Sequence, residues 1–163
     1  MPSAPSKNLQ CVPNPHVDRD YEVDHVVPEF TCVCPMTGQP DFAIIRIRYV
    51  PDRWLVELKS LKLYMWAYRN EGAFHEDVTN RILNDLVRML APRRMEVVGD
   101  WNVRGGIKTV VTVRYEAPSG AARASRTDRG AGRSGTSPGR AQSAPAPRGA
   151  VRPPRRRASG SPS

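Results

Sequence analysis

The sequence has 163 residues and a formal net charge of +9, and a chain of this length is expected to form one domain with a modest core. Residues 1–116 carry 15 Lys and Arg against 15 Asp and Glu, whereas residues 117–163 carry ten Arg and one acid, so the excess charge lies in the last 47 residues. This distribution argues against a nucleic-acid surface on residues 1–116. Neither a membrane span nor a signal peptide is expected, because the apolar runs are too short.

Both ends of the chain differ in composition from the middle. Residues 1–15 contain four Pro, and we predict a flexible N-terminal segment there. Residues 117–163 consist mainly of Arg, Pro, Gly, Ser and Ala without an aromatic residue, and they are predicted to be a disordered tail because they bury too little apolar area. The tail is either a passive extension or a segment that contacts nucleic acid through Arg155, Arg156 and Arg157. One compact domain is therefore predicted over residues 16–116.

The first half of this domain is predicted to hold two strands and a helix. Residues 42–50 alternate, with Ile44, Arg46 and Arg48 on one face and Ile45, Ile47 and Tyr49 on the other, as in a strand. After a turn at residues 51–53, a strand over 54–58 is expected to pair with it as an antiparallel hairpin. Ser60 is the predicted N-cap of a helix that ends near Arg69.

The second half is predicted to hold a helix and a hairpin. Apolar residues recur at every fourth position over residues 75–90, which predicts an amphipathic helix that Pro92 ends. Strands over 95–101 and 108–115 then flank a turn at 104–106. The order β-β-α-α-β-β predicts an α+β fold, an antiparallel sheet with helices on one face. Its strands at 42–50 and 108–115 are expected to be open edges, so sheets of several subunits should join into a barrel with sites between subunits.

A cysteine and an acid share one Pro- and Gly-rich loop, at Cys34 and Asp41. A thiolate is a strong nucleophile and a buried, partly protonated carboxyl can donate protons, so this pair predicts covalent catalysis. The alternatives are a packed thiol at Cys34 and a turn-capping role for Asp41. Three cysteines do not make a disulfide framework and fit a reducing cytoplasm. A zinc site of Cys32, Cys34 and His75 has poor spacing, and no metal is expected.

Four segments together resemble a known family. They are Cys34-Pro35 with Asp41-Phe42, the run from Glu57 to Tyr64 (ELKSLKLY), Phe74-His75-Glu76-Asp77, and Arg104-Gly105-Gly106. In this order and spacing the chain resembles, over about residues 16–116, the unimodular NADPH-dependent 7-cyano-7-deazaguanine reductases. These are nitrile reductases of queuosine biosynthesis in tRNA with the tunnelling fold (T-fold).

The resemblance implies the following roles. Cys34 would form a thioimide with the nitrile and Asp41 would donate protons, while two NADPH reduce each nitrile to the amine of 7-aminomethyl-7-deazaguanine. The deazaguanine base would be bound by Val56, Glu57, Leu58, His75 and Glu76, and the subunits would form two stacked pentamers. Cations are needed for the NADPH phosphates, and we assign Lys59, Lys62 and Arg104, since no Gly-x-Gly-x-x-Gly sequence follows a strand.

Purely structural roles are the alternatives for these residues, and two other functions are alternatives for the protein. His75, Glu76 and Asp77 also suit a helix cap and first turn, and the lysines suit a solvated basic face. The same fold also occurs in zinc-dependent hydrolases of the GTP cyclohydrolase type, and a nucleic-acid-binding protein acting through its tail is the other alternative.

Overall fold

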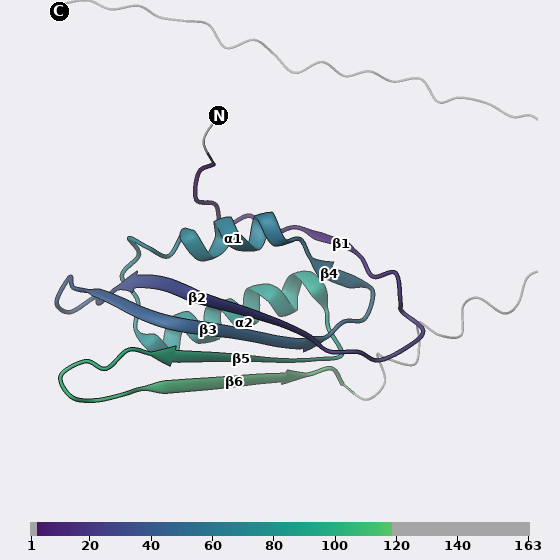
Figure 1. Cartoon of the computed structure of the whole chain (residues 1–163). Helices are drawn as coiled ribbons and strands as arrows, with labels where there is room; N and C mark the ends of the chain where they lie inside the picture. The colour runs from purple at the N-terminus through teal and green to yellow at the C-terminus, as the bar shows by residue number, and fades with distance from the viewer. Residues whose placement is uncertain (1–2, 119–163) are drawn as a thin grey trace, which may run out of the picture. The chain divides into compact units, whose positions relative to one another are not determined.

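The computed structural model describes residues 3–118, and the tail predicted over 117–163 therefore lies, beyond Ala117 and Pro118, outside the described residues. Two sheets and two helices make up this part of the chain (Figure 1). The large sheet has the strand order β2-β3-β5-β6 and is antiparallel throughout, and β1 pairs with β4 in a small second sheet. The elements are β1 (Cys11–Pro13), β2 (Val23–Val33), β3 (Pro40–Val50), β4 (Trp54–Val56), α1 (Leu58–Trp66), α2 (His75–Leu90), β5 (Arg94–Trp101) and β6 (Val110–Glu116).

The core lies between the large sheet and the helices. Ile45 and Ile47 of β3 are buried, whereas Ile44 and Arg46, which alternate with them, are exposed, as the sequence pattern predicts. Helix α2 packs on β5 and β6 and α1 on β2, and the buried face of α2 is formed by Val78, Thr79, Ile82, Leu83, Leu86 and Leu90. The predicted α+β fold with antiparallel sheets is thus confirmed. The two helices do lie between two pairs of strands of the large sheet along the chain, but the first pair is β2 and β3 and not the predicted strands at 42–50 and 54–58.

The predicted hairpin between residues 42–50 and 54–58 is wrong. Strand β3 is hydrogen-bonded by β2 on one side and β5 on the other, so it is an interior strand, and the edges of the sheet are β2 and β6. The sequence pattern missed β2 because Pro28 interrupts it: the β2–β3 register shifts between Val27 and Phe30, and a proline within a run argues against a strand. Because β2 is an edge, it can accommodate that residue.

The prediction that residues 1–15 form a flexible segment is also partly wrong. Cys11–Pro13 pairs antiparallel with β4, and the Ser6 amide donates to the Leu63 carbonyl at 3.1 Å. Lys7 forms an ion pair with Glu71, with 2.8 Å between Nζ and Oε2. The prolines that suggested a loose end do not prevent pairing, because Pro13 stands at the end of its strand, where a missing N–H is tolerated.

Helix α1 begins earlier than predicted. Its N-cap is Glu57, whose two carboxylate oxygens accept from the amides of Lys59 and Ser60 at 2.8 and 2.7 Å. Ser60 lies inside the first turn, where its hydroxyl donates to the Glu57 carbonyl at 2.8 Å. The helix ends at Trp66. Helix α2 matches its predicted bounds, with Glu76 and Asp77 as acids of its first turn, where they stabilise the helix dipole.

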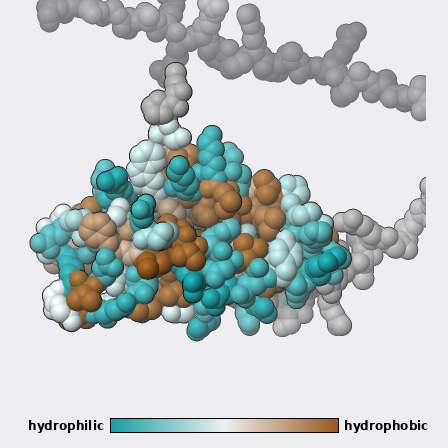
Figure 2. Space-filling model, viewed as in Figure 1, coloured by the Kyte–Doolittle hydropathy of each residue, from teal (hydrophilic) through white to brown (hydrophobic). Residues whose placement is uncertain are grey.

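Apolar side chains also reach the surface. Figure 2 shows brown apolar atoms among teal polar ones over β2 and β3. Among the side chains on the face of the sheet opposite the core, Val26, Phe42, Ile44 and Val110 are between 44% and 54% exposed. No helix in residues 3–118 is both long and apolar enough to cross a membrane.

Candidate active site

The β2–β3 hairpin places Cys34 at its tip. The last paired residues are Val33 and Pro40. Beyond them the Cys34 amide donates to the Gln39 carbonyl at 2.8 Å, and the Gly38 amide donates to the Cys34 carbonyl at 2.9 Å. Gly38 has a φ of 69°, a conformation that favours glycine. These bonds close the loop of residues 34–39, which we call the Cys34 loop, and leave the thiol half-buried.

Asp41 follows this loop on β3 and points to the buried face of the sheet. Strand alternation puts it on the same face as Ala43 and Ile45, and only 6% of the residue is exposed. Its Oδ1 accepts from an Arg104 guanidinium nitrogen at 2.7 Å, and its Oδ2 lies 3.4 Å from His75 Nε2. The buried carboxylate is thus flanked by two basic side chains from other elements.

His75 is positioned by the first turn of α2 and by an aromatic partner. Its ring stacks on Trp101, with 3.9 Å between ring centroids and 8° between ring planes. Trp101 ends β5 and is 1% exposed. Gly99 makes room for the indole, because a Cβ built there would lie 2.8 Å from Trp101 Nε1. The stacking holds the His75 ring against the Asp41 carboxylate.

Arg104 reaches the same place from the β5–β6 turn. The backbone amides and carbonyls of Arg104 and Ile107 bond reciprocally at 2.9 and 3.0 Å, with Gly105 and Gly106 at positive φ between them. Besides Asp41, the guanidinium donates to Thr37 Oγ1 at 2.5 Å and to Gln39 Oε1 at 3.2 Å. The side chains of Cys34, Thr37, Asp41, His75 and Arg104 therefore form one group, which we call the Cys34 cluster.

The two neighbouring cysteines have different reactivity. The Thr37 hydroxyl, the Met36 backbone and Arg104 lower the pKa of Cys34 to about 7. Cys32 is fully buried with its thiol toward the Ala73 carbonyl, and burial raises its pKa to about 11. Near pH 7 the thiolate is therefore far more populated at Cys34 than at Cys32. Only Cys34 thus combines exposure with thiolate character.

Four of the ten predicted site residues, Cys34, Asp41, His75 and Arg104, come together in the cluster. The other six do not join it in this chain. Val56 is buried on β4, where its amide donates to the Tyr49 hydroxyl at 3.3 Å. The Glu57 carboxylate caps α1, as described above. The remaining four residues are exposed, and they are Leu58, Lys59 and Lys62 on α1 and Glu76 on α2.

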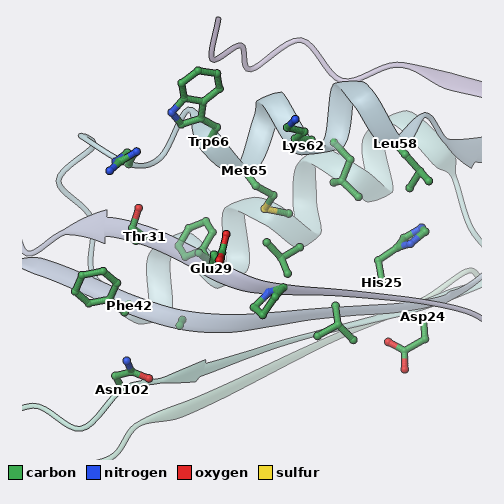
Figure 3. Close-up of a pocket in the computed structure, with 17 residues that line it drawn as sticks. Asp24, His25, Glu29, Thr31, Phe42, Leu58, Lys62, Met65, Trp66 and Asn102 are labelled. Carbon is green, nitrogen blue, oxygen red and sulfur yellow. The ribbon is translucent and has the colours of Figure 1, made fainter. Parts of the chain in front are cut away.

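Two hollows adjoin these residues. The larger, about 920 Å³, lies along β2 and α1; its wall includes Leu58, Lys62 and Trp66 from α1 (Figure 3). The smaller, about 270 Å³, is lined by residues 39–42 and 102–104, which include Asp41 and Arg104. Phe42 and Asn102 line both hollows, so the two hollows adjoin at these residues, and we call the pair of hollows the groove. Lys59 lines neither hollow.

Sequence reasoning missed two residues of the site. Thr37 lies in a turn-rich stretch that carries no sign of its contact with Arg104, and Trp101 was assigned only to a strand. A signal existed for Trp101, because Gly99 two residues earlier on a strand indicates close approach of another group. In residues 3–118, no group of three or more His, Cys, Asp or Glu side chains is arranged to hold a metal ion, and this includes the weak candidate Cys32, Cys34 and His75.

Comparisons with known proteins give one consistent family. The family model described as QueF-like protein matches residues 40–120. A protein of Thermomicrobium roseum named NADPH-dependent 7-cyano-7-deazaguanine reductase is 68% identical over 116 residues, which are 71% of this chain and 91% of that protein. Proteins with the same name from Anaeromyxobacter sp. strain K and Nitrosococcus oceani are 66% and 55% identical, over 74% and 72% of this chain and 99% and 92% of theirs.

One solved structure supports the fold. The crystal structure of the archaeosine synthase QueF-Like in its apo form superposes with a TM-score of 0.55 at 18% sequence identity. The superposition covers 60% of this chain and 95% of the chain in that crystal structure. At that identity the similarity concerns the fold alone.

Proposed function

Because the chain belongs to the QueF-like family of NADPH-dependent 7-cyano-7-deazaguanine reductases, we propose that it reduces the nitrile of 7-cyano-7-deazaguanine through a thioimide on Cys34. The family resemblance stated from the motifs is confirmed. The chain is an oxidoreductase that uses NADPH, and its product, 7-aminomethyl-7-deazaguanine, belongs to queuosine biosynthesis. The relatives' shared name supports this function over the zinc-dependent hydrolase and the nucleic-acid-binding alternatives.

The observation that carries the mechanism is the Cys34 cluster. A half-buried thiol whose pKa is lowered to about 7 lies on the loop that leads into a buried carboxylate. A nitrile carbon accepts a hydride poorly until a nucleophile has added to it, and a thiolate is the strongest such nucleophile among protein side chains. Cys34 and Asp41 supply the nucleophile and the proton from one hairpin.

In the first step we propose that the Cys34 sulfur forms a bond to the nitrile carbon, and one π-electron pair of the C≡N bond moves to nitrogen. The nitrogen takes a proton from Asp41, which receives it from the Cys34 thiol when that thiol is not already ionised. The product is a thioimide, with no net change in oxidation state. Two NADPH, bound in turn, would each supply one of the two hydrides that the conversion to an amine requires, and Asp41 would again pass protons from solvent to the nitrogen. Between the two reductions the C–S bond breaks, and Cys34 leaves as a thiolate.

We propose that the base of the substrate is held by carboxylates and backbone groups, because a guanine-like edge presents N–H donors. Leu58, at the start of α1, and Trp66, at its end, both line the larger hollow, and Figure 3 draws Leu58 over the part of β2 that carries His25 and Trp66 over the part that carries Thr31. Nine residues of extended chain separate His25 from Cys34, which corresponds to roughly 30 Å. Glu57 therefore lies too far along β2 to share a base with Cys34 of the same chain.

This spacing supports the proposal that each site is completed by a neighbouring subunit. One subunit would contribute Cys34, Asp41, His75 and Glu76, and the other Glu57 with the backbone of Val56 and Leu58. The exposed edges β2 and β6 are available for joining sheets into a barrel. Two stacked pentamers remain the proposed assembly.

For the cofactor we propose the groove. Lys62 lines its larger hollow and Arg104 its smaller hollow, so each hollow has a cation, as the separated phosphates of NADPH require. Lys59 lies outside the groove of the single chain and is proposed to reach the cofactor from a neighbouring subunit. The three free cysteines are consistent with a cytoplasmic enzyme, which we also propose.

The test follows the absorbance of NADPH after addition of 7-cyano-7-deazaguanine to the assembled protein. The proposal requires consumption of two NADPH per nitrile. No consumption by correctly assembled protein would contradict it, and a product other than the amine would contradict the reaction assigned.

A further inference from the structure

Arg104 is the residue whose contacts its cofactor role does not explain. Its guanidinium donates to Thr37 Oγ1, Gln39 Oε1 and Asp41 Oδ1. Thr37 and Gln39 belong to the Cys34 loop and Asp41 to the start of β3, whereas Arg104 comes from the β5–β6 turn more than 60 positions later. A cation whose only role was to bind a phosphate of the cofactor would not require these three hydrogen bonds within the protein.

The backbone of the β5–β6 turn holds Arg104 in position for this contact. The reciprocal backbone bonds between Arg104 and Ile107, with two glycines at positive φ, define one conformation for the turn. The planar guanidinium then presents one nitrogen to Asp41 and another to Thr37 and Gln39, an arrangement that a lysine ammonium cannot reproduce. The Arg104 side chain is 32% exposed and Asp41 6%, so much of the contact is shielded from water.

We propose that Arg104 is a positioning residue for the covalent step: through Thr37 it holds the Cys34 loop so that the sulfur and the Asp41 carboxyl are ready before NADPH binds. This inference rests on the proposed thioimide mechanism and adds a role in its NADPH-independent half. The Thr37 hydroxyl accepts from Arg104, which leaves its own proton free to turn toward the Cys34 sulfur. A hydroxyl that accepts a hydrogen bond from a guanidinium is polarised, so its own hydrogen bond stabilises a thiolate more strongly than the bond from an isolated hydroxyl would.

The charges around Cys34 agree with this role. His75 on α2 faces Asp41 on β3. Asp41 and Glu71 act on the neighbouring Cys32, whose pKa burial and these acids raise to about 11, so Cys32 is protonated near pH 7. Within the described residues, the Thr37 hydroxyl, the Met36 backbone and Arg104 lower the pKa of Cys34, and Arg104 is the cation of these three. In turn, contact with Cys34 and Asp41 raises the pKa of Arg104.

The test measures thioimide formation without NADPH, which separates this role from cofactor binding. Full-length protein is mixed with 7-cyano-7-deazaguanine, and the rate of adduct formation is followed by mass spectrometry across a range of pH. For Arg104→Met we expect the pH midpoint to move upward from about 7 toward the ordinary value of 9.0. An upward move of one pH unit lowers the thiolate fraction at pH 7 about fivefold, so the rate should fall by at least that factor.

Matched variants define the contacts. Thr37→Val should slow the adduct and raise its pH midpoint, whereas Thr37→Ser should retain both values. Arg104→Lys should recover only part of the rate, since its ammonium lacks the two-armed contact. Lys108→Met is the control: it removes a cation of the same hairpin that pairs with Asp100 instead, and it should leave adduct formation unchanged. Thermal unfolding of each variant verifies that it is folded.

The outcomes are separable. If Arg104→Met forms the adduct at the normal rate and pH midpoint and only its KM for NADPH rises, Arg104 is a cofactor residue and the inference is overturned. A normal rate in Thr37→Val, or a full rate in Arg104→Lys, overturns the part played by the hydroxyl or by the two-armed contact. If the unaltered protein forms no adduct, the thioimide mechanism itself fails.

Discussion

Replacing Asp41 with Asn tests the proposed proton donor directly. Asn keeps the size and the hydrogen-bonding oxygen of the side chain but has no carboxyl proton to exchange. General acid catalysis typically contributes a factor of about 10² to 10⁴, so we expect turnover to fall by at least about 10²-fold, which corresponds to roughly 2.7 kcal/mol of barrier.

The structure allows the loss of stability to be separated from the loss of catalysis. Asp41 accepts a charged hydrogen bond from Arg104 at 2.7 Å in a nearly buried position. A hydrogen bond that involves a charge stabilises by about 1.5–3 kcal/mol and a neutral one by about 0.5–1.5, so the variant should lose about 1 kcal/mol of unfolding free energy. A loss of this size leaves most of the protein folded, since domains are stable by about 5–15 kcal/mol.

The assay has three readouts on full-length protein. Initial rates of NADPH oxidation give turnover, substrate titration gives binding, which should change much less, and urea denaturation gives stability. Near-normal turnover in a folded Asp41→Asn variant would refute the reasoning and leave Asp41 as a structural residue of the hairpin.

Further predictions concern the thiol, the core and the assembly. Cys34→Ala should abolish the adduct seen by mass spectrometry and Cys32→Ala should retain it; an adduct on Cys32 would show that the wrong sulfur was chosen. In the unaltered protein, adduct formation should accelerate as pH rises through about 7, because the lowered Cys34 pKa makes the thiolate form there; a midpoint near 9 would contradict this. Gly99→Ala should reduce the unfolding free energy by about 1–3 kcal/mol, because its Cβ would meet the Trp101 indole, and unchanged urea denaturation would argue against that packing. A chain shortened to residues 1–116 should still form the large species in light scattering, and an active monomer would contradict the site between subunits.

The part of the site that the sequence predicted depends on short-range geometry. Cys34 and Asp41 are seven positions apart, at the tip and the returning strand of one hairpin, so a short stretch of sequence is enough to pair them. Strand alternation also predicts that Asp41 and Phe42 face opposite sides of the sheet, and the helical period over residues 75–90 places His75 at the start of α2. These features depend on local geometry, which repeats every two or every 3.6 residues and is therefore written in the sequence.

Long-range pairing was the part that periodicity could not supply. Residues 54–56 pair with Cys11–Pro13 and not with β3, whose two sides are taken by β2 and β5. A short apolar run contains no information about which of several strands it will meet, and Pro28 concealed the long strand that did pair with β3.

The sequence by itself determined the family and the α+β class and pointed to the proposed nucleophile and acid, because each depends on residue types at short, ordered spacings. Only the tertiary structure decided that Arg104 meets Asp41 and Thr37, and that the Glu57 carboxylate caps α1. The physical reason is that the Arg104 contacts join segments brought together by the packing of the sheet and helices. A contact of that kind depends on the whole fold and leaves no pattern in either segment alone.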